Sequence, residues 1–472
     1  MIQVIQFIVA LSLLVVIHEF GHYMFARMFN VRVNKFYMFF NSKISLVRAK
    51  RFNGKWHFAF FAKNIEELKK GEKIEDLPDD DWRKYPDNTE WGIGWIPFGG
   101  YCAIDGMVDE TTKSDQLSTE TKPWEYRSQK AWKRMLIISG GVLMNFVGAI
   151  VIYIMMLFIN GESYIPLRNA YLGYDYCNTA LKYGFVNGDV VKSVNGHVVE
   201  TDKDVTERII IEGLCDVQVE RNGAEERVLL PKKFSEEVVE AQESAFMQIR
   251  FPFTVGEVVN GSPAEKAGIM TGDSIMAVDS ISVVAASDFV AMLNSMKGRE
   301  ITLTIARNGK TQYNRVTPDT AGKIGFVINP ELDGFEAVEV EYNFLEAIPA
   351  GCIYGWETLV NYIKQFRLVF TKAGAKSVGG FIAIGKIFPE EWSWIRFWSI
   401  TAFLSIILAF MNILPIPVLD GGYLLMLLIE MLTGKKPSDK FMNIALNIGM
   451  FLLLALLIYA NGNDIFKLIM GK

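Results

Sequence analysis

Three residues near the N-terminus have the types and spacing of a metal site. His18, Glu19 and His22 form the pattern H-E-x-x-H within the segment VVIHEFGHYM. Positions i and i+4 of an α-helix lie on one face, so both imidazoles can reach one ion while the carboxylate stands beside it. The chain has only four histidines, which makes a chance match rare. The pattern favours zinc, a divalent ion that suits nitrogen ligands.

Asp420 is the best candidate for a third ligand, since a catalytic zinc ion usually has three protein ligands and one open position. The other two histidines are expected to be structural. His57 follows an Asn-Gly turn in an alternating, strand-like stretch, and His197 lies in a β-rich segment. Glu430, further along the same apolar segment as Asp420, remains the alternative carboxylate ligand.

Four apolar stretches are long enough, or nearly so, to cross a bilayer, which takes about 20 helical residues. They are Ile2–Met24, Met135–Ile159, Phe397–Leu414 and Phe441–Ala460. The first lacks the basic start and the cleavage site of a signal peptide, so we expect it to be retained. Half of the chain is apolar and its formal net charge is −5. A membrane protein is favoured, and no nucleic-acid partner is indicated.

Lysines and arginines flank these stretches unevenly, which predicts their orientation. The N-terminus and residues 160–396 should face outward, and residues 27–134 should face the cytoplasm. Counted along their spans, His22 and Asp420 then both lie roughly 30 Å from the outer face. Pro415 and Pro417 would break the helix there, which is tolerated where the backbone is buried in protein or lines a cavity.

The outward segment contains an internal repeat. GDVVKSVNG (188–196) is echoed by GDSIMAVDS (272–280), and VERNG (219–223) by IARNG (305–309). Each copy combines a Gly-Asp turn, a short β-branched strand and an Asn-Gly hairpin. The copies resemble PDZ domains, which bind extended peptides along a sheet edge. A purely structural pair of β-domains is the alternative.

HEFGH together with NILPIPVLDGG (412–422) resembles the site-2 protease family of intramembrane zinc metalloproteases. The tandem PDZ-like repeat resembles the bacterial RseP group of that family, and GWIPFGGY (94–101) and GGVLMNFVGA (140–149) resemble further family segments. The resemblance implies a multi-pass α-helical membrane protein with four transmembrane helices, a membrane-associated β-hairpin region and two inserted PDZ-like domains. The expected segments are helix 1 at 1–26, the β region at 27–131, helix 2 at 132–160, PDZ-like domains at 165–240 and 245–332, surface helices at 340–392, helix 3 at 395–433 and helix 4 at 438–461.

The resemblance also implies residue roles. Zinc would be bound by His18, His22 and Asp420, with Glu19 as general base, and substrate would be held by Asn412, Pro415 and Pro417. The strand-like segment Phe36–Phe61 would be the hairpin that pairs with substrate backbone, and residues 64–90 look like a charged insertion. Phe381 and Tyr423 depart from residues that are frequent in the family, proline and histidine.

The activity implied by the resemblance is hydrolysis of peptide bonds within or near transmembrane segments. Implied substrates are single-span membrane proteins of the anti-sigma factor or signal-peptide type, cut by a zinc enzyme of the bacterial inner membrane whose active site lies toward the cytoplasm. Three alternatives remain open: an inactive scaffold with peptide-binding domains, a metal transporter, and another H-E-x-x-H protease that uses Glu430.

Overall fold

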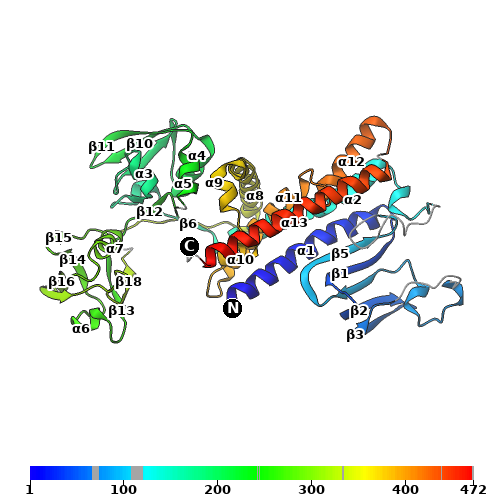
Figure 1. Cartoon of the computed structure of the whole chain (residues 1–472), viewed down its shortest axis with the longest axis horizontal. Helices are drawn as coiled ribbons and strands as arrows, with labels where there is room; N and C mark the ends of the chain where they lie inside the picture. The colour runs from blue at the N-terminus through cyan, green and yellow to red at the C-terminus, as the bar shows by residue number, and fades with distance from the viewer. Residues whose placement is uncertain are drawn as a thin grey trace. The chain divides into compact units, whose positions relative to one another are not determined.

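The computed structural model describes residues 1–65, 74–107, 121–241, 243, 245–331, 334–436 and 438–469, so residues 66–73 of the predicted insertion lie outside the described part. The chain forms two compact units, whose elements are labelled in Figure 1. The helical unit comprises Met1–Gly161, Glu341–Lys364 and Val378–Lys472. The β unit comprises Glu162–Val340 and Gln365–Ser377.

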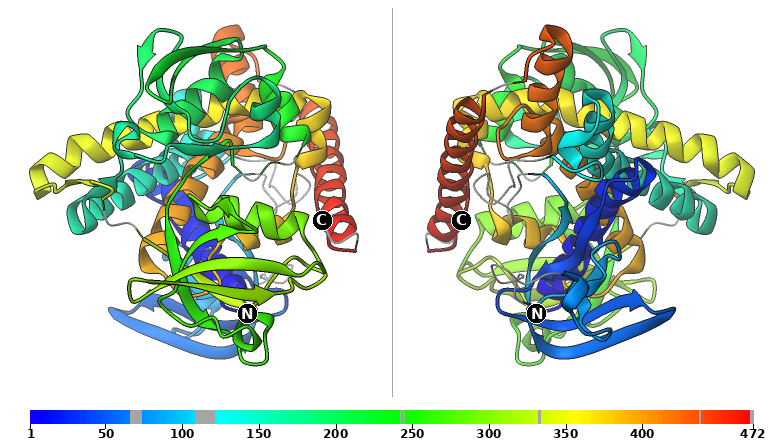
Figure 2. Two further views of the ribbon diagram at one scale, coloured as in Figure 1. Left: turned by 90° about the vertical axis from the view of Figure 1, so that its left-hand side faces the viewer. Right: turned by 90° about the vertical axis from the view of Figure 1, so that its right-hand side faces the viewer.

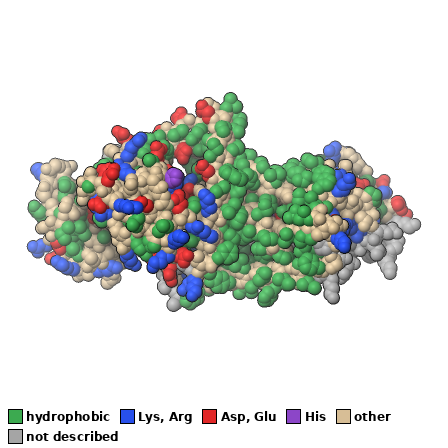
Figure 3. Space-filling view, turned by 90° about the horizontal axis from the view of Figure 1, so that it is seen from above, with side chains coloured by type: hydrophobic (Ala, Val, Ile, Leu, Met, Phe, Trp, Pro, Cys, Tyr) green, Lys and Arg blue, Asp and Glu red, His purple; other side chains and the backbone are tan. Residues whose placement is uncertain are grey.

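Long apolar helices form the frame of the helical unit. In the described part of the chain, four helices are long and apolar enough to cross a membrane, in agreement with the four predicted apolar stretches: α1 (Ile2–Met28), α2 (Ala131–Asn160), α11 (Trp394–Ile413) and α13 (Asp439–Ile469). Helix α2 packs along both α1 and α11, whereas α13 stands at the outside of the group (Figure 2). Hydrophobic side chains cover much of one face of these helices (Figure 3). Such a surface suits lipid rather than water.

Helices α1 and α2 approach each other closely because glycines meet where they cross. A Cβ atom on Gly21 would lie 2.1 Å from the carbonyl oxygen of Gly140, and one on Gly140 would lie 2.5 Å from the carbonyl oxygen of Gly21. Neither position has room for a larger residue. The crossing lies one residue before His22, so backbone contact brings α2 against the H-E-x-x-H face of α1.

The third apolar segment is broken, as its prolines predict. Helix α11 ends at Ile413, and α12 (Asp420–Thr433) begins after a turn that contains Pro415 and Pro417. Val418 has a φ of 88°, a left-handed conformation that costs a β-branched residue about 1–3 kcal/mol. The predicted helix at 395–433 is therefore two helices, and the break places Asp420 in the first turn of the second.

A five-stranded sheet follows α1. Its strands pair in the order β3-β2-β4-β1-β5, and they are β1 (Val33–Phe40), β2 (Ile44–Phe52), β3 (Lys55–Lys63), β4 (Glu90–Ile93) and β5 (Ile96–Ile104). Asn53 and Gly54 form the predicted β2–β3 turn with φ values of 51° and 73°. The strand-like segment Phe36–Phe61 therefore contains the β2–β3 hairpin around its Asn-Gly turn, while β1 pairs with β4 and β5 rather than with β2.

Helix α8 (Phe344–Phe366), predicted to lie on the surface, packs one face on α2. Gly351 and Gly355 face Ile154 and Ile150 of α2, while side chains such as Trp356 are exposed. A short helix, α10 (Phe381–Ile387), begins where Asp464 of α13 accepts hydrogen bonds from the Gly380 and Ala383 amides at 3.0 and 2.9 Å.

The β unit contains the two predicted repeats. The first has β7 (Tyr174–Tyr176), α3 (Asn178–Lys182), β8 (Val190–Val194), β9 (His197–Val198), α4 (Asp202–Glu212), β10 (Cys215–Arg221), β11 (Ala224–Leu230), α5 (Phe234–Glu240) and β12 (Met247–Ile249). The second has β13 (Phe253–Val258), α6 (Pro263–Lys266), β14 (Ser274–Val278), β15 (Ile281–Ser282), α7 (Ala286–Ser295), β16 (Ile301–Arg307), β17 (Lys310–Val316) and β18 (Phe326–Pro330). Strands β6 (Glu162–Tyr164) and β19 (Val338–Val340) pair with each other, and α9 (Lys372–Ser377) packs on α5. Because β12 pairs with β7, the first repeat extends beyond the predicted end at 240.

The repeated Gly-Asp and Arg-Asn-Gly motifs meet in space in the same way in both copies. Arg221 donates to Asp189 at 2.7 and 2.8 Å, and Arg307 donates to Asp273 at 2.6 Å through two nitrogens. Both aspartate side chains are almost fully buried. A bidentate, charge-assisted pair of this kind fixes the turn before each central strand, which accounts for the recurrence of both motifs.

Replacing Asp273 with asparagine should loosen the second repeat by about 1.5–3 kcal/mol, the usual worth of hydrogen bonds to a charged group. Burial would raise the pKa of Asp273, but the hydrogen bonds from Arg307 outweigh it and hold the pKa below its usual value. This stabilisation is therefore complete above about pH 4, the unfolded pKa, and is lost as the pH falls through the folded pKa. Hydrogen exchange of β14 and β16 in the whole protein should report it. Asp216→Asn, at an exposed ion pair, should have little effect.

Candidate metal centre

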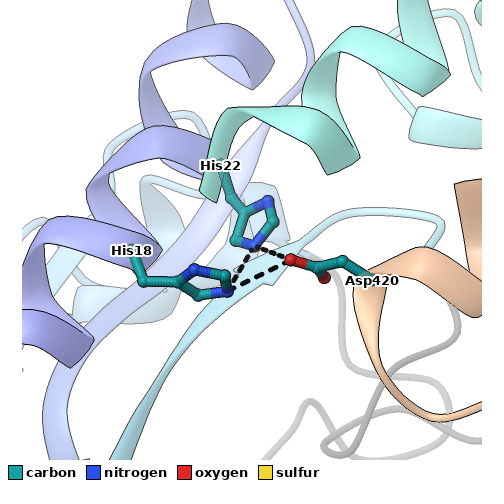
Figure 4. A group of neighbouring side chains, drawn as sticks. All are labelled: His18, His22 and Asp420. Carbon is teal, nitrogen blue, oxygen red and sulfur yellow. Dashed lines mark hydrogen bonds and ion pairs between the residues drawn. The ribbon is translucent and has the colours of Figure 1, made fainter. Parts of the chain in front are cut away.

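Side chains from α1 and from the start of α12 converge on one point (Figure 4). The Nε2 atoms of His18 and His22 lie 3.2 Å apart, and Asp420 Oδ2 lies 3.2 Å from the first and 3.5 Å from the second. Ligand atoms around a tetrahedral zinc ion, at metal distances near 2.0–2.1 Å, lie about 3.3 Å from one another. The triangle of two nitrogens and one oxygen therefore fits a zinc ion.

The chemical state of these atoms also suits a cation. Within the described residues, Asp420 Oδ2 is buried without a hydrogen-bond partner, although an unsatisfied buried oxygen is costly. The His22 Nδ1 atom lies 2.9 Å from the carbonyl oxygen of Ile137 on α2. A proton on Nδ1 leaves Nε2 with a free lone pair that points toward His18 and Asp420. Together these donors could hold a divalent metal ion.

The break between α11 and α12 places Asp420. Gly421 and Gly422 follow it, and a Cβ on Gly421 would lie 2.1 Å from the Leu414 carbonyl oxygen, so the chain doubles back tightly here. The first turn of a helix also favours a carboxylate, because its free amide groups carry partial positive charge. Local backbone geometry thus holds the aspartate at the end of a tight turn.

A cavity of about 530 Å³ opens beside the three side chains. Glu19 and Asn412 line it, as do Gly99, Gly100 and Tyr101 of strand β5. Three residues of α13 complete the wall, Leu446, Asn447 and Met450. The cavity has the size of a small-ligand or peptide pocket, and its lining combines apolar side chains with polar ones.

Of the three residues predicted to hold substrate, one lies at the cavity. Asn412 faces the cavity, whereas Pro415 and Pro417 are not among the described residues that line it. Pro417 instead contacts α13: a Cβ atom on Gly449 of that helix would lie 2.0 Å from the Pro417 carbonyl oxygen. The prolines therefore shape the turn and its contact with α13.

The alternative ligands lie elsewhere. Glu430 accepts a 2.5 Å hydrogen bond from Arg134 at the start of α2. His57 stacks on Phe52 with ring centres 3.8 Å apart, and His197 is exposed in β9 of the β unit. Among the residues that the structure describes, only His18, His22 and Asp420 form a cluster of metal-ligating side chains.

Two residues of α2 beside the cluster were not predicted to belong to the site. Asn145 Nδ2 lies 3.1 Å from His18 Nδ1. A Cβ on Gly141 would lie 2.6 Å from both His18 Cε1 and His22 Nε2. Both residues occur in the segment GGVLMNFVGA, where a polar asparagine and paired glycines in an apolar span were the available signal.

Substitution of Gly141 by alanine should weaken metal binding about tenfold or more, the scale seen when the surroundings of metal ligands are disturbed. The new methyl group would collide with both imidazoles and displace them. Asp420 lies on another helix and would not move with them, so the three ligand atoms would lose their spacing. Competition with a chromogenic chelator would measure the effect. Gly148→Ala on the same helix is the matched control, because its Cβ would lie 3.4 Å from the nearest atom, in Ile17. Equal affinities for both variants would contradict the steric argument.

Comparison with known proteins shows the family of this chain. The family model for Peptidase family M50 matches residues 6–62 and 81–456, which include the whole cluster and nearly all of the chain. This chain belongs to peptidase family M50. The membership agrees with the resemblance to site-2 proteases seen in the motifs.

Relatives of this M50 peptidase match over almost their full lengths. A protein of Neisseria meningitidis whose name includes the words zinc metalloprotease is 27% identical over 98% of this chain and 99% of its own length. The regulator of sigma-E protease RseP of Salmonella typhimurium is 27% identical, and the regulator of sigma E protease of Haemophilus influenzae is 26% identical, each over 98% of both chains. The M50 chain is thus a metalloprotease of the site-2 protease type, with four apolar helices suited to a membrane.

Proposed function

We propose that this protein is an intramembrane zinc protease that cuts peptide bonds within or near transmembrane segments of other membrane proteins. The observation that carries the proposal is the triangle of His18, His22 and Asp420 at zinc-ligand spacing, on the wall of a cavity between apolar helices. Zinc bound there would supply Lewis acidity, lowering the pKa of a water molecule toward 7 and polarising a peptide carbonyl.

The chain's own residues would do the rest of the chemistry. Glu19 lies next to His18 in the sequence and faces the same cavity, so its carboxylate would take the proton of the attacking water and pass it to the leaving amine. Asn412, also on the cavity wall, would hold substrate backbone through its amide. Each role needs only a group that faces the cavity.

Strand β5 would bind the substrate backbone. A transmembrane helix hides its carbonyl groups in its own hydrogen bonds, so it must unwind before hydrolysis. Among the described strands, β5 lies at the end of its sheet and pairs only with β1. Five of its residues line the cavity: Gly99, Gly100, Tyr101, Cys102 and Ile104. Addition of a substrate strand to this edge would replace the helical hydrogen bonds. This assigns to β5 the role expected of the hairpin within Phe36–Phe61.

The β2–β3 hairpin has another use in this proposal. Trp56, Phe58 and Phe60 alternate along β3, and their side chains are 50%, 60% and 65% exposed. Alternate residues of a strand lie on one face, so this face presents a row of exposed aromatic rings. Aromatic side chains concentrate at membrane interfaces. The row supports membrane association of the sheet.

The substrates and the cellular location of the protein are proposed from the names of its relatives and from the distribution of its lysines and arginines. RseP relatives are named as regulators of sigma E, so we propose regulated intramembrane proteolysis of single-span proteins of the anti-sigma factor type, with signal-peptide remnants as a second class. The enzyme would lie in a bacterial inner membrane. The two repeats would act as PDZ-like domains on the outer side, binding peptide or limiting access.

The orientation can be tested with a reporter that is active only outside the cytoplasm. Fusion after Gly161 should give signal and fusion after Arg51 should not, because lysines and arginines concentrate on the cytoplasmic side of the first two spans. The reverse pattern would contradict the proposed orientation and would place the metal cluster toward the outer face.

The activity itself can be tested on the purified chain in detergent. Metal content should show bound zinc, and a synthetic single-span peptide should be cut within its apolar segment. A chelator should remove the bound zinc and abolish cleavage, and added zinc should restore cleavage. Cleavage that persists after complete removal of metal would refute the proposed chemistry.

A further inference from the structure

The side chain of Asn145 poses a hydrogen-bonding problem beside the metal cluster. The residue is fully buried on α2, with Nδ2 3.1 Å from His18 Nδ1. Its Oδ1 is buried and has no hydrogen-bond partner among the residues that the structure describes. Its backbone carbonyl oxygen accepts a 2.7 Å hydrogen bond from Ser405 of α11, so its position is held by two helices. A buried amide oxygen left unpaired destabilises the folded protein, and such a group needs an explanation.

The proton on each imidazole is decisive. A neutral histidine that binds a metal through Nε2 carries its proton on Nδ1. For His22 this proton has an acceptor, the carbonyl oxygen of Ile137 at 2.9 Å. For His18 the facing atom is the amide nitrogen of Asn145. With metal on His18 Nε2, two N–H groups would point at each other while the amide oxygen stayed unpaired.

We propose that Asn145 is the hydrogen-bond acceptor that sets the metal-binding tautomer of His18. Oxygen and nitrogen of an amide occupy nearly the same volume, so half a turn about the Cβ–Cγ bond exchanges them without a change in packing. Oδ1 then accepts the Nδ1 proton of His18. The amide nitrogen then takes the place of the oxygen, which has no hydrogen-bond partner in the described part of the chain. The half turn therefore breaks no hydrogen bond on that side and makes one to His18.

Helix α2 would in this way orient both imidazoles. The acceptor for His22 is the backbone carbonyl of Ile137, and the acceptor for His18 is the side chain of Asn145. Outer hydrogen bonds of this kind fix ring orientation and raise ligand basicity. Asn145 is a positioning residue, since it acts on the metal through His18. The inference rests on the proposed function only in taking His18 as a zinc ligand.

Zinc affinity of variants separates an acceptor from a donor. Asn145→Asp keeps an acceptor and removes the donor, so the full-length protein in detergent should bind zinc within about threefold of the parent affinity or more tightly, as carboxylate–histidine–zinc arrangements do. Asn145→Leu fills the space without an acceptor and should bind zinc about 10–100-fold more weakly. Asn160→Leu, at the exposed end of α2, should match the parent.

Nitrogen-15 NMR of labelled histidine gives a second readout that a packing role would not change. In the zinc-loaded parent and in Asn145→Asp, His18 should have a protonated Nδ1 and a metal-bound Nε2. If Asn145→Asp lost zinc as severely as Asn145→Leu, or if both bound it like the parent, the inference would be overturned while the zinc site stood. A parent protein without zinc affinity would overturn both the inference and the proposed function.

Discussion

Glu19→Gln should leave zinc bound while peptide cleavage falls about 10²–10⁴-fold, the range for loss of a general base. Glutamine has nearly the size and shape of glutamate but cannot take a proton from water. The triangle of His18, His22 and Asp420 does not include residue 19, so the affinity for the metal should change little. Single-turnover cleavage of a transmembrane peptide and metal analysis of the same sample would measure both effects.

The combination of the two measurements is what tests the assignment. An inactive variant that has also lost zinc would show only that residue 19 supports the metal site. A variant that retains zinc and cuts at near the parent rate would refute Glu19 as the base. Glu430→Gln is a suitable comparison, because Glu430 pairs with Arg134 and should matter for stability rather than for proton transfer.

Asp420→Ala should weaken zinc binding by about 10²-fold or more and abolish cleavage, since loss of a ligand exceeds the 10–100-fold cost of disturbing the ligands' surroundings. The two histidines that remain lie on one helix and leave half of a tetrahedral ion open. Zinc titration against a chelator of known affinity would give the change directly. Full zinc occupancy in this variant would remove Asp420 from the site.

Two histidine variants serve as controls for the same assay. His57→Ala removes a ring stacked on Phe52, and His197→Ala alters an exposed strand of the β unit. Neither should change zinc affinity or the cleavage rate of the folded protein. A loss of zinc in either variant would mean that the cluster has a ligand outside the triangle.

The sequence predicted local turns better than the pairing of distant strands. The Asn53-Gly54 hairpin was predicted correctly from its turn, which depends on neighbouring residues only. The place of β4 between β1 and β2, and hence the position of β5 at the edge beside the cavity, depends on pairing between strands far apart in the chain. The end of the first repeat, predicted at residue 240, depends on distant pairing in the same way, since β12 pairs with β7 and extends that repeat.

The sequence by itself determined the features that arise within a single element. These are the four apolar helices, the i and i+4 spacing of His18 and His22, the proline break before Asp420 and the repeated β motifs of the second unit. Only the tertiary structure decided which residues of other helices touch the cluster. Gly141 and Asn145 lie beside the cluster because glycines let α2 approach the backbone of α1. The packing of two helices cannot be derived from the period of either one.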